Sequence, residues 1–260
     1  MSDAATLSGK TAVVTGSSSG IGRAIALRLA AAGAHVLVHA RQNRNGAEEV
    51  VGLARRHGIE ATAVLTDLSQ INELDRFAAD AWSWRGEIDI LVNNAGADTL
   101  TGEASRWSFE RKLEALWQVD VVASIRLTRL IGRQMKKRNA GAIVNVGWDQ
   151  AECGMGGDSG ELFAATKGAV MAFTRSAAQS LAPQVRVNCV APGWIKTSWG
   201  ESASDNWQER AVAESLLARW GTPVDVAAAV EFLVSPDAAF ITGQVLPVNG
   251  GWRRAKINDE

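Results

Sequence analysis

Short apolar, β-branched runs alternate with longer amphipathic stretches along nearly the whole chain. The apolar runs predict seven strands, at residues 11–14, 34–40, 60–65, 88–92, 142–146, 184–190 and 244–248. The amphipathic stretches predict helices at residues 22–32, 44–57, 71–84, 116–138, 162–181 and 224–234. This alternation is typical of a parallel α/β sheet, and the continuous apolar runs indicate strands that are covered on both faces.

The chain has 260 residues, of which 47% are hydrophobic and 21% charged, so it can bury a sizeable core. We find no internal repeat and no interdomain linker, and seven strands in one sheet fit one domain over residues 1–260. The glycine-rich stretch at 154–160 has the composition of a linker. Because a strand and a long helix flank it closely, we predict a surface loop there.

The formal net charge is −1, which argues against a partner such as a nucleic acid or an anionic membrane. Cys153 and Cys189 stand alone, without CxxC spacing, so we expect neither a disulfide framework nor a metal site. The first apolar segment is too short for a signal peptide, and no apolar run approaches the ~20 residues of a membrane span. A cytoplasmic location is therefore expected.

A glycine- and serine-rich turn follows the first predicted strand and opens directly into a helix. It consists of Gly16, Ser17, Ser18, Ser19, Gly20, Ile21 and Gly22. Glycines let the backbone approach a ligand closely, and a helix N-terminus offers unpaired N–H groups with partial positive charge. The alternative is a plain turn, but the strand–turn–helix context favours a site for the pyrophosphate of a dinucleotide.

The end of the second predicted strand bears on the choice of dinucleotide. It reads His39-Ala40-Arg41-Gln42, without the carboxylate that usually binds the adenosine ribose of NAD. The guanidinium of Arg41 suits a 2′-phosphate instead, so we predict NADP(H), with NAD(H) as the alternative. His35 and His39 are four residues apart, but on a strand this spacing indicates a structural role and no metal site.

Further motifs in the same order resemble the short-chain dehydrogenase/reductase (SDR) family over about residues 7–252. They are Thr66-Asp67-Leu68, Asn93-Asn94-Ala95-Gly96, the segment from Pro192-Gly193 through Ile195 to Thr197, and the C-terminal Asn249-Gly250-Gly251. The resemblance implies a doubly wound Rossmann sheet of order 3-2-1-4-5-6-7 with helices on both faces, and commonly a homotetramer. It also implies that Asp67, Leu68, Asn93, Ala95 and Gly96 lie beside the adenosine, and that Pro192, Gly193, Ile195 and Thr197 line the nicotinamide.

The catalytic positions depart from the family pattern of serine, tyrosine and lysine with an upstream asparagine. Lys167 matches the lysine, but Phe163 stands where the tyrosine should be, and the composition contains no tyrosine at all. The serine is replaced by Gly147, Trp148 or Asp149, depending on the alignment, and the asparagine by Asp120. We therefore predict a catalytic set of Asp120, Trp148, Phe163 and Lys167, in which Lys167 also holds the nicotinamide ribose.

Losing a positioned general acid typically costs about 10²–10⁴-fold in rate, so reduction of an ordinary carbonyl should be impaired. The leading interpretation is an NADP(H)-binding oxidoreductase acting on an unidentified carbonyl or alcohol. One alternative is a cofactor-binding pseudoenzyme, and another is a non-redox lyase or isomerase. Acidic groups in the following loop are candidate proton donors, because desolvation would raise their pKa values; they are Asp149, Glu152, Cys153, Asp158 and Glu161.

Five of the ten tryptophans fall in or after the segment that covers the substrate in this family. They are Trp194, Trp199, Trp207, Trp220 and Trp252. If several face the cleft, the ligand is apolar or aromatic; packing in the core or between subunits is the equally weighted alternative.

Overall fold

The computed structural model describes residues 6–252. Its centre is a seven-stranded sheet in the order β3-β2-β1-β4-β5-β6-β7, with every pair of neighbours parallel. The strands are β1 (Thr11–Val14), β2 (His35–Ala40), β3 (Ala61–Leu65), β4 (Ile90–Asn93), β5 (Ala142–Val146), β6 (Arg186–Pro192) and β7 (Val245–Val248). The predicted order is confirmed, and the predicted strand ends differ by at most two residues.

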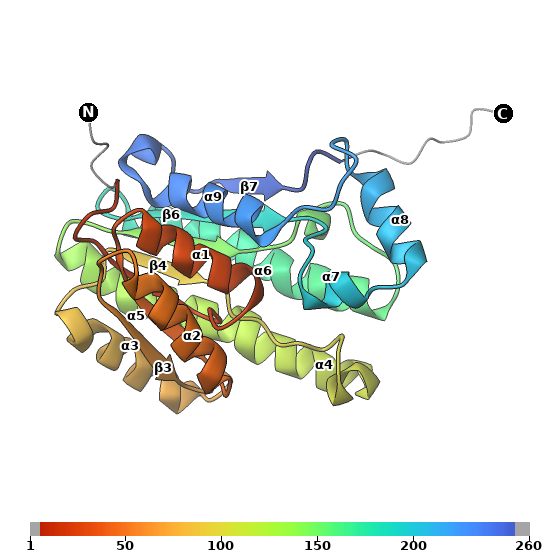
Figure 1. The fold of residues 1–260 in the computed structure, drawn as a ribbon, viewed down its shortest axis with the longest axis horizontal. Coiled ribbons are helices and arrows are strands. Elements are labelled where there is room, and N and C mark those ends of the chain that lie inside the picture. The colour runs from red at the N-terminus through yellow and green to blue at the C-terminus, as the bar shows by residue number, and fades with distance from the viewer. Residues whose placement is uncertain (1–5, 253–260) are drawn as a thin grey trace.

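Helices cover both faces of the sheet (Figure 1). One face carries α1 (Gly20–Ala31), α2 (Arg44–Arg55) and α9 (Pro223–Val234), and the other carries α3 (Ile71–Arg85), α5 (Ala123–Lys137) and α6 (Asp158–Leu181). Successive strand residues point to opposite faces, so Val13 and Val14 are both fully buried but belong to different core clusters. The central strands β1, β4 and β5 therefore have no solvent-facing side, which explains their continuous apolar runs.

Two of the predicted helices differ from the structure by more than two residues at one end. The stretch 116–138 is divided into the end of α4 (Phe109–Leu116), a π-helical turn (Trp117–Val122) and α5. Helix α6 begins at Asp158 rather than at 162, so the second half of the predicted glycine-rich loop is helical. Glycine is a poor helix former, which hid this start; Asp158 and Glu161 in the first turn favour it electrostatically.

The segment after β6 contains two helices that the periodicity did not predict, α7 (Ser198–Ser202) and α8 (Asp205–Glu214). They lie at the same end of the molecule as α4 (Figure 1). The strand order reverses between β1 and β4, because β2 and β3 lie on one side of β1 and β4 to β7 on the other. In open α/β sheets, ligands bind at such a point, beyond the carboxyl ends of the strands. Among the helices of residues 6–252, none has the length and apolarity to cross a bilayer.

Candidate functional site

The turn from β1 into α1 is closed by two glycines that tolerate no side chain. Gly16 has φ 63°, and a Cβ built on it would lie 2.8 Å from the Cα of Ala95. A Cβ on Gly22 would lie 2.2 Å from the carbonyl oxygen of Gly16. The helix can therefore pack directly on the turn, which leaves the backbone itself as the surface of the cleft.

The imidazole of His39 holds this turn in place. Its Nδ1 accepts a hydrogen bond from the Gly16 N–H at 3.0 Å, and its Nε2 donates to the Thr66 carbonyl at 2.9 Å. These two bonds require the neutral ring with its proton on Nε2. Burial lowers the pKa of His39 from 6.5 to about 4, so the ring stays neutral at physiological pH. The predicted structural role of His39 is confirmed, and His35 Nδ1 likewise accepts from the Glu60 N–H.

A cleft of about 1130 Å³ opens beside this turn. It is lined by eight residues of the predicted cofactor set, which are Gly16, Ser18, Ser19, Arg41, Asp67, Leu68, Ala95 and Gly96. The side chain of the helix cap, Ser19, makes no capping hydrogen bond, and the first turn of α1 contains no acid. The N–H groups of Gly20, Ile21 and Gly22 thus remain available to an anion.

Arg41 is exposed on the wall of this cleft, and within residues 6–252 its guanidinium forms no hydrogen bond or ion pair of its own. An unpaired cation at the end of β2 and free N–H groups at the start of α1 match the charges of a phosphorylated dinucleotide. The residues present therefore fit a nicotinamide dinucleotide. Within the described chain, no group of three or more His, Cys, Asp or Glu side chains is placed to hold a metal ion.

Two residues of the predicted cofactor set face the interior instead of the cleft. Ser17 is fully buried; its hydroxyl donates to the Val14 carbonyl at 2.7 Å and accepts from the His39 N–H at 3.0 Å. The buried Asn93 amide donates to Thr128 Oγ1 and to Asn145 Oδ1. Both residues support the cleft from behind.

Asn94 lines both this cleft and the neighbouring cavity, although the sequence motifs alone assigned it no role. Its amide donates to the carbonyls of Thr15 and Gly16, each at 3.0 Å. The signal was already present, because Asn94 lies inside the Asn93–Gly96 motif.

Lys167 and Asp120 form a buried ion pair beside the cavity that neighbours the cleft. Lys167 Nζ lies 2.8 Å from Asp120 Oδ2 and donates to the Val146 carbonyl at 3.3 Å. Asp120 Oδ1 accepts from the Ala97 N–H at 2.9 Å, and only 1% of the Asp120 side chain is exposed. The π-helical turn that contains Asp120 brings this carboxylate to the lysine.

Gly147, one of the three candidates for the serine position, is closely surrounded by other side chains. A Cβ on Gly147 would lie 2.7 Å from Met171 Cγ and 2.9 Å from Cys189 Sγ, so this position has no room for any side chain. Trp148 is the next residue and lines the cavity. Its indole packs edge-on against Phe163, with the ring centroids 6.1 Å apart.

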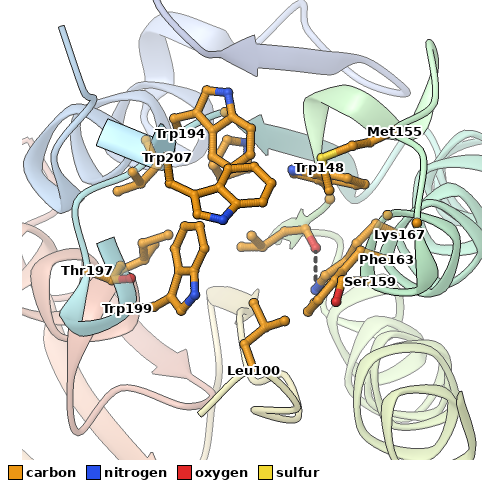
Figure 2. Close-up of a pocket in the computed structure, with 18 of the residues that line it drawn as sticks. Leu100, Trp148, Met155, Ser159, Phe163, Lys167, Trp194, Thr197, Trp199 and Trp207 are labelled. Carbon is orange, nitrogen blue, oxygen red and sulfur yellow. Dashed lines mark hydrogen bonds between the residues drawn. The ribbon is translucent and has the colours of Figure 1, made fainter. Parts of the chain in front are cut away.

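The cavity has a volume of about 610 Å³ and is mostly apolar (Figure 2). Trp194, Trp199 and Trp207 form one wall, with ring centroids 5.3 to 6.2 Å apart. Of the predicted residues, it is also lined by Ile21, Trp148, Phe163, Lys167, Pro192, Gly193, Ile195 and Thr197. Trp220 is buried behind the wall, so the tryptophans are divided between the cavity and the core, and the apolar ligand stays a prediction.

The candidate proton donors of the loop are spread apart. Burial raises the pKa of Asp149 to about 6, as the desolvation argument expected, and Asn249 donates to its Oδ2 at 3.0 Å. Asp149 nevertheless does not belong to the described lining of the cavity, whereas Asp158 does. Glu152 pairs with Arg175 at 3.3 Å on the surface. Cys153 and Glu161 are exposed.

Comparison with known proteins shows the family of this chain. A family model described as enoyl-(acyl carrier protein) reductase matches residues 16–253. Dehydrogenase/reductase SDR family member 4 of Homo sapiens is 36% identical over 252 residues, which cover 94% of this chain and 88% of that protein. The chain belongs to the short-chain dehydrogenase/reductase family.

Solved SDR structures agree closely with this fold. A 7α-hydroxysteroid dehydrogenase in complex with NADH and 7-oxo glycochenodeoxycholic acid has a TM-score of 0.87 at 32% identity, over 98% of each chain. A short-chain dehydrogenase from Burkholderia cenocepacia in complex with NADP has a TM-score of 0.84 at 32% identity, over 95% of this chain and 98% of that one. These SDR relatives bind a nicotinamide dinucleotide, the class of ligand that the cleft fits.

The Asp120–Lys167 pair predicts a specific stability cycle for this SDR protein. Asp120→Asn leaves a buried ammonium without its counter-charge, and Lys167→Met leaves a buried carboxylate. Each change should lower the free energy of unfolding in urea by about 3–5 kcal/mol. The double variant should lose clearly less than the sum of the two. Glu152→Gln breaks a surface pair and serves as the control, with a loss below about 1 kcal/mol. Additive losses would contradict the coupling.

His39 predicts a pH dependence of stability. Its pKa is about 4 in the folded protein and 6.5 when the ring is fully solvated, so the unfolded chain binds more protons between these values. The free energy of unfolding should therefore fall by about 3 kcal/mol as the pH drops from 6.5 to 4. His39→Gln keeps one donor and one acceptor but does not titrate. The difference between wild type and variant should shrink through this window, and parallel curves would refute the role given to the imidazole.

Proposed function

We propose that this SDR protein is an NADP(H)-dependent oxidoreductase that acts on a carbonyl or alcohol group of an apolar, ring-bearing compound. One observation carries the proposal: the phosphate-binding turn and the cavity that contains Lys167 meet at Asn94, which lines both. A dinucleotide with its pyrophosphate at the start of α1 would therefore extend toward the tryptophan-lined cavity. The bound nicotinamide would supply or accept a hydride there.

Each residue of the proposed catalytic set has a definite task. Lys167 lines the cavity and has one N–H left after its bonds to Asp120 and Val146, enough to bind a ribose hydroxyl. Asp120 is a positioning residue that holds Lys167. Trp148 supplies an N–H donor in place of the serine hydroxyl, while Phe163 can only pack against the substrate.

The preference for NADP(H) rests on Arg41, which faces the cleft without a carboxylate neighbour at the end of β2. Two further parts of the proposal concern its setting: the protein works in the cytoplasm, and it forms a homo-oligomer, a tetramer or a dimer. Exposed apolar side chains on α9 and next to β7 support association, namely Val224, Phe232 and Phe240.

The two alternative functions receive no comparable support. A lyase or isomerase would need a carboxyl group with a suitable pKa in the cavity, but Asp149, whose pKa is raised, does not belong to the described lining. A pseudoenzyme would keep the cleft and perform no turnover. This alternative stays a prediction that measurement of hydride transfer decides.

Arg41 should set the preference between the two dinucleotides. Arg41→Gln removes a charged donor for the 2′-phosphate and should weaken NADPH binding about 10- to 100-fold, with NADH binding little changed. Isothermal titration calorimetry measures both. Arg56→Gln removes an exposed arginine of the same charge at the end of α2 and should leave both affinities unchanged. Equal weakening of NADPH and NADH by Arg41→Gln would contradict the assignment.

Restoring the missing hydroxyls should restore ordinary carbonyl reduction. The combined change Phe163→Tyr and Trp148→Ser should raise the turnover of a simple ketone by about 10²-fold or more, because a phenol one helical turn from Lys167 can donate the proton. The readout is oxidation of NADPH.

Phe173→Tyr adds the same hydroxyl to α6, in the core and away from the cavity, and should change nothing. The proposal would be overturned if wild type binds NADPH but neither wild type nor the double variant oxidises it with any carbonyl compound. Failure of wild type to bind either dinucleotide would overturn it as well.

A further inference from the structure

The cavity combines flat aromatic walls with few groups able to exchange a proton. We propose that it binds a flat, neutral, conjugated dicarbonyl compound of the quinone type, one oxygen of which accepts a hydrogen bond from the Trp148 indole N–H. This inference rests on the proposed oxidoreductase function and names its substrate class. It follows from the shape of the walls, from the donors that face the cavity and from the chemistry that remains without a tyrosine.

The walls favour a flat ring system. Trp194, Trp199 and Trp207 stand on one side of the cavity, and Trp148 and Phe163 on the other, with Leu100 and Met155 closing the ends (Figure 2). Trp194 and Trp199 are stacked at 22° between their planes. Part of the 610 Å³ would be taken by a nicotinamide, so the remainder suits a ligand of two or three fused rings.

The polar groups of the cavity favour an oxygen acceptor over a charged ligand. The charged residues in its described lining are Asp158, which is exposed at its edge, and Lys167, which is paired with Asp120. Within residues 6–252 the Trp148 N–H has no hydrogen-bond partner, and it points toward the open space in Figure 2. Trp194, in contrast, donates to Glu214 at 2.7 Å. A carbonyl oxygen is the group that a lone N–H in an apolar wall can hold.

The remaining hydroxyl near Lys167 does not replace the phenol. Ser159 lies one helical turn before Phe163 on the same face of α6 and lines the cavity. A serine hydroxyl exchanges its proton readily only beside a base, and Ser159 makes no side-chain hydrogen bond within the described residues. The Lys167 ammonium contacts the Asp120 carboxylate and the Val146 carbonyl.

A substrate whose reduced anion is weakly basic tolerates this lack of a general acid. Reduction of a simple ketone leaves an alkoxide, whose conjugate acid is as weak as water, with a pKa of about 16. Reduction of a quinone leaves a phenolate, whose conjugate acid has a pKa of about 10. The quinone product is therefore less basic by about six pKa units and does not need a positioned acid to take its proton.

The overall step is balanced with the cofactor class already proposed. With reduced nicotinamide dinucleotide as the hydride source, a C–H bond of the dihydronicotinamide breaks and its hydrogen leaves with both bonding electrons. The hydrogen forms an O–H bond at one quinone oxygen, and the electron pair passes through the conjugated ring to the other oxygen, which becomes a phenolate. This phenolate takes one proton from water, and the product leaves as the hydroquinone. Trp148 keeps its own proton throughout and only binds the oxygen, so its substitution should act mainly on substrate affinity and KM.

A binding experiment tests the recognition without turnover. Calorimetry on the NADP⁺-saturated protein compares 1,4-naphthoquinone with naphthalene, which has the same rings and no oxygen. Trp148→Phe keeps an aromatic ring but removes the N–H, and should weaken naphthoquinone binding about 10-fold while leaving naphthalene unchanged. Trp84→Phe, outside the cavity, is the matched control and should change neither. Equal affinity of wild type and Trp148→Phe for naphthoquinone overturns the proposed contact.

A turnover experiment tests the substrate class. Wild type with NADPH should reduce 1,4-naphthoquinone at least about 10²-fold faster than 1-tetralone, a two-ring ketone of matched size, after subtraction of the rate without protein. Phe163→Tyr should raise the tetralone rate strongly and the naphthoquinone rate less than about threefold. Equal rates for both compounds, or no naphthoquinone reduction by protein that has bound NADPH, would overturn the substrate class. Loss of NADPH binding itself would instead signal failure of the proposed function.

Discussion

The buried contact between Lys167 and Asp120 governs what this SDR site can do. An ammonium in an apolar surrounding needs a counter-charge and hydrogen-bond acceptors, and here the carboxylate 2.8 Å away and the Val146 carbonyl supply them. Phe163, one helical turn before Lys167, has no hydroxyl. The carboxylate of Asp120 balances the charge of the lysine, which lines the cavity and, under the proposed function, would bind a ribose.

The fold delivers these groups because parallel strands end at a common edge. Val146 closes β5, Asn93 closes β4, and the phosphate-binding turn follows β1, so segments far apart in sequence meet beyond one side of the sheet. His39 at the end of β2 then fixes the turn through the Gly16 N–H. The shape of the cleft therefore depends on backbone geometry and on one neutral imidazole.

Much of this architecture can be predicted from the sequence, because strands that are buried on both faces leave continuous apolar runs and because the glycine motif sits between a strand and a helix. The π-helical turn at Trp117–Val122 was hidden, since its hydrophobic pattern runs on into α5 without a break. The start of α6 was hidden by glycines. The sequence also could not predict that the side chains of Ser17 and Asn93 point inward, because a motif gives the position of a residue and not the direction of its side chain.

The serine position shows how much depends on three-dimensional contacts. From the sequence, Gly147, Trp148 and Asp149 were all candidates for it. Met171 and Cys189 crowd Gly147, the indole of Trp148 lines the cavity, and Asp149 does not belong to the described lining. Likewise, the tryptophans after β6 could be divided between cavity wall and core only once their neighbours were known. The sequence thus shows which chemical groups the site contains, and the packing shows where their side chains point.

We infer that the chain keeps a nicotinamide dinucleotide site while lacking the phenol that usually moves the proton in this family. A crystal structure of the protein with NADP⁺ tests it most directly. The account predicts the 2′-phosphate on Arg41, the pyrophosphate at the start of α1, and the nicotinamide ribose on Lys167 with the Asp120 contact intact. Indole side chains filling the nicotinamide position, or a hydroxyl from another segment beside the reacting carbon, would contradict it.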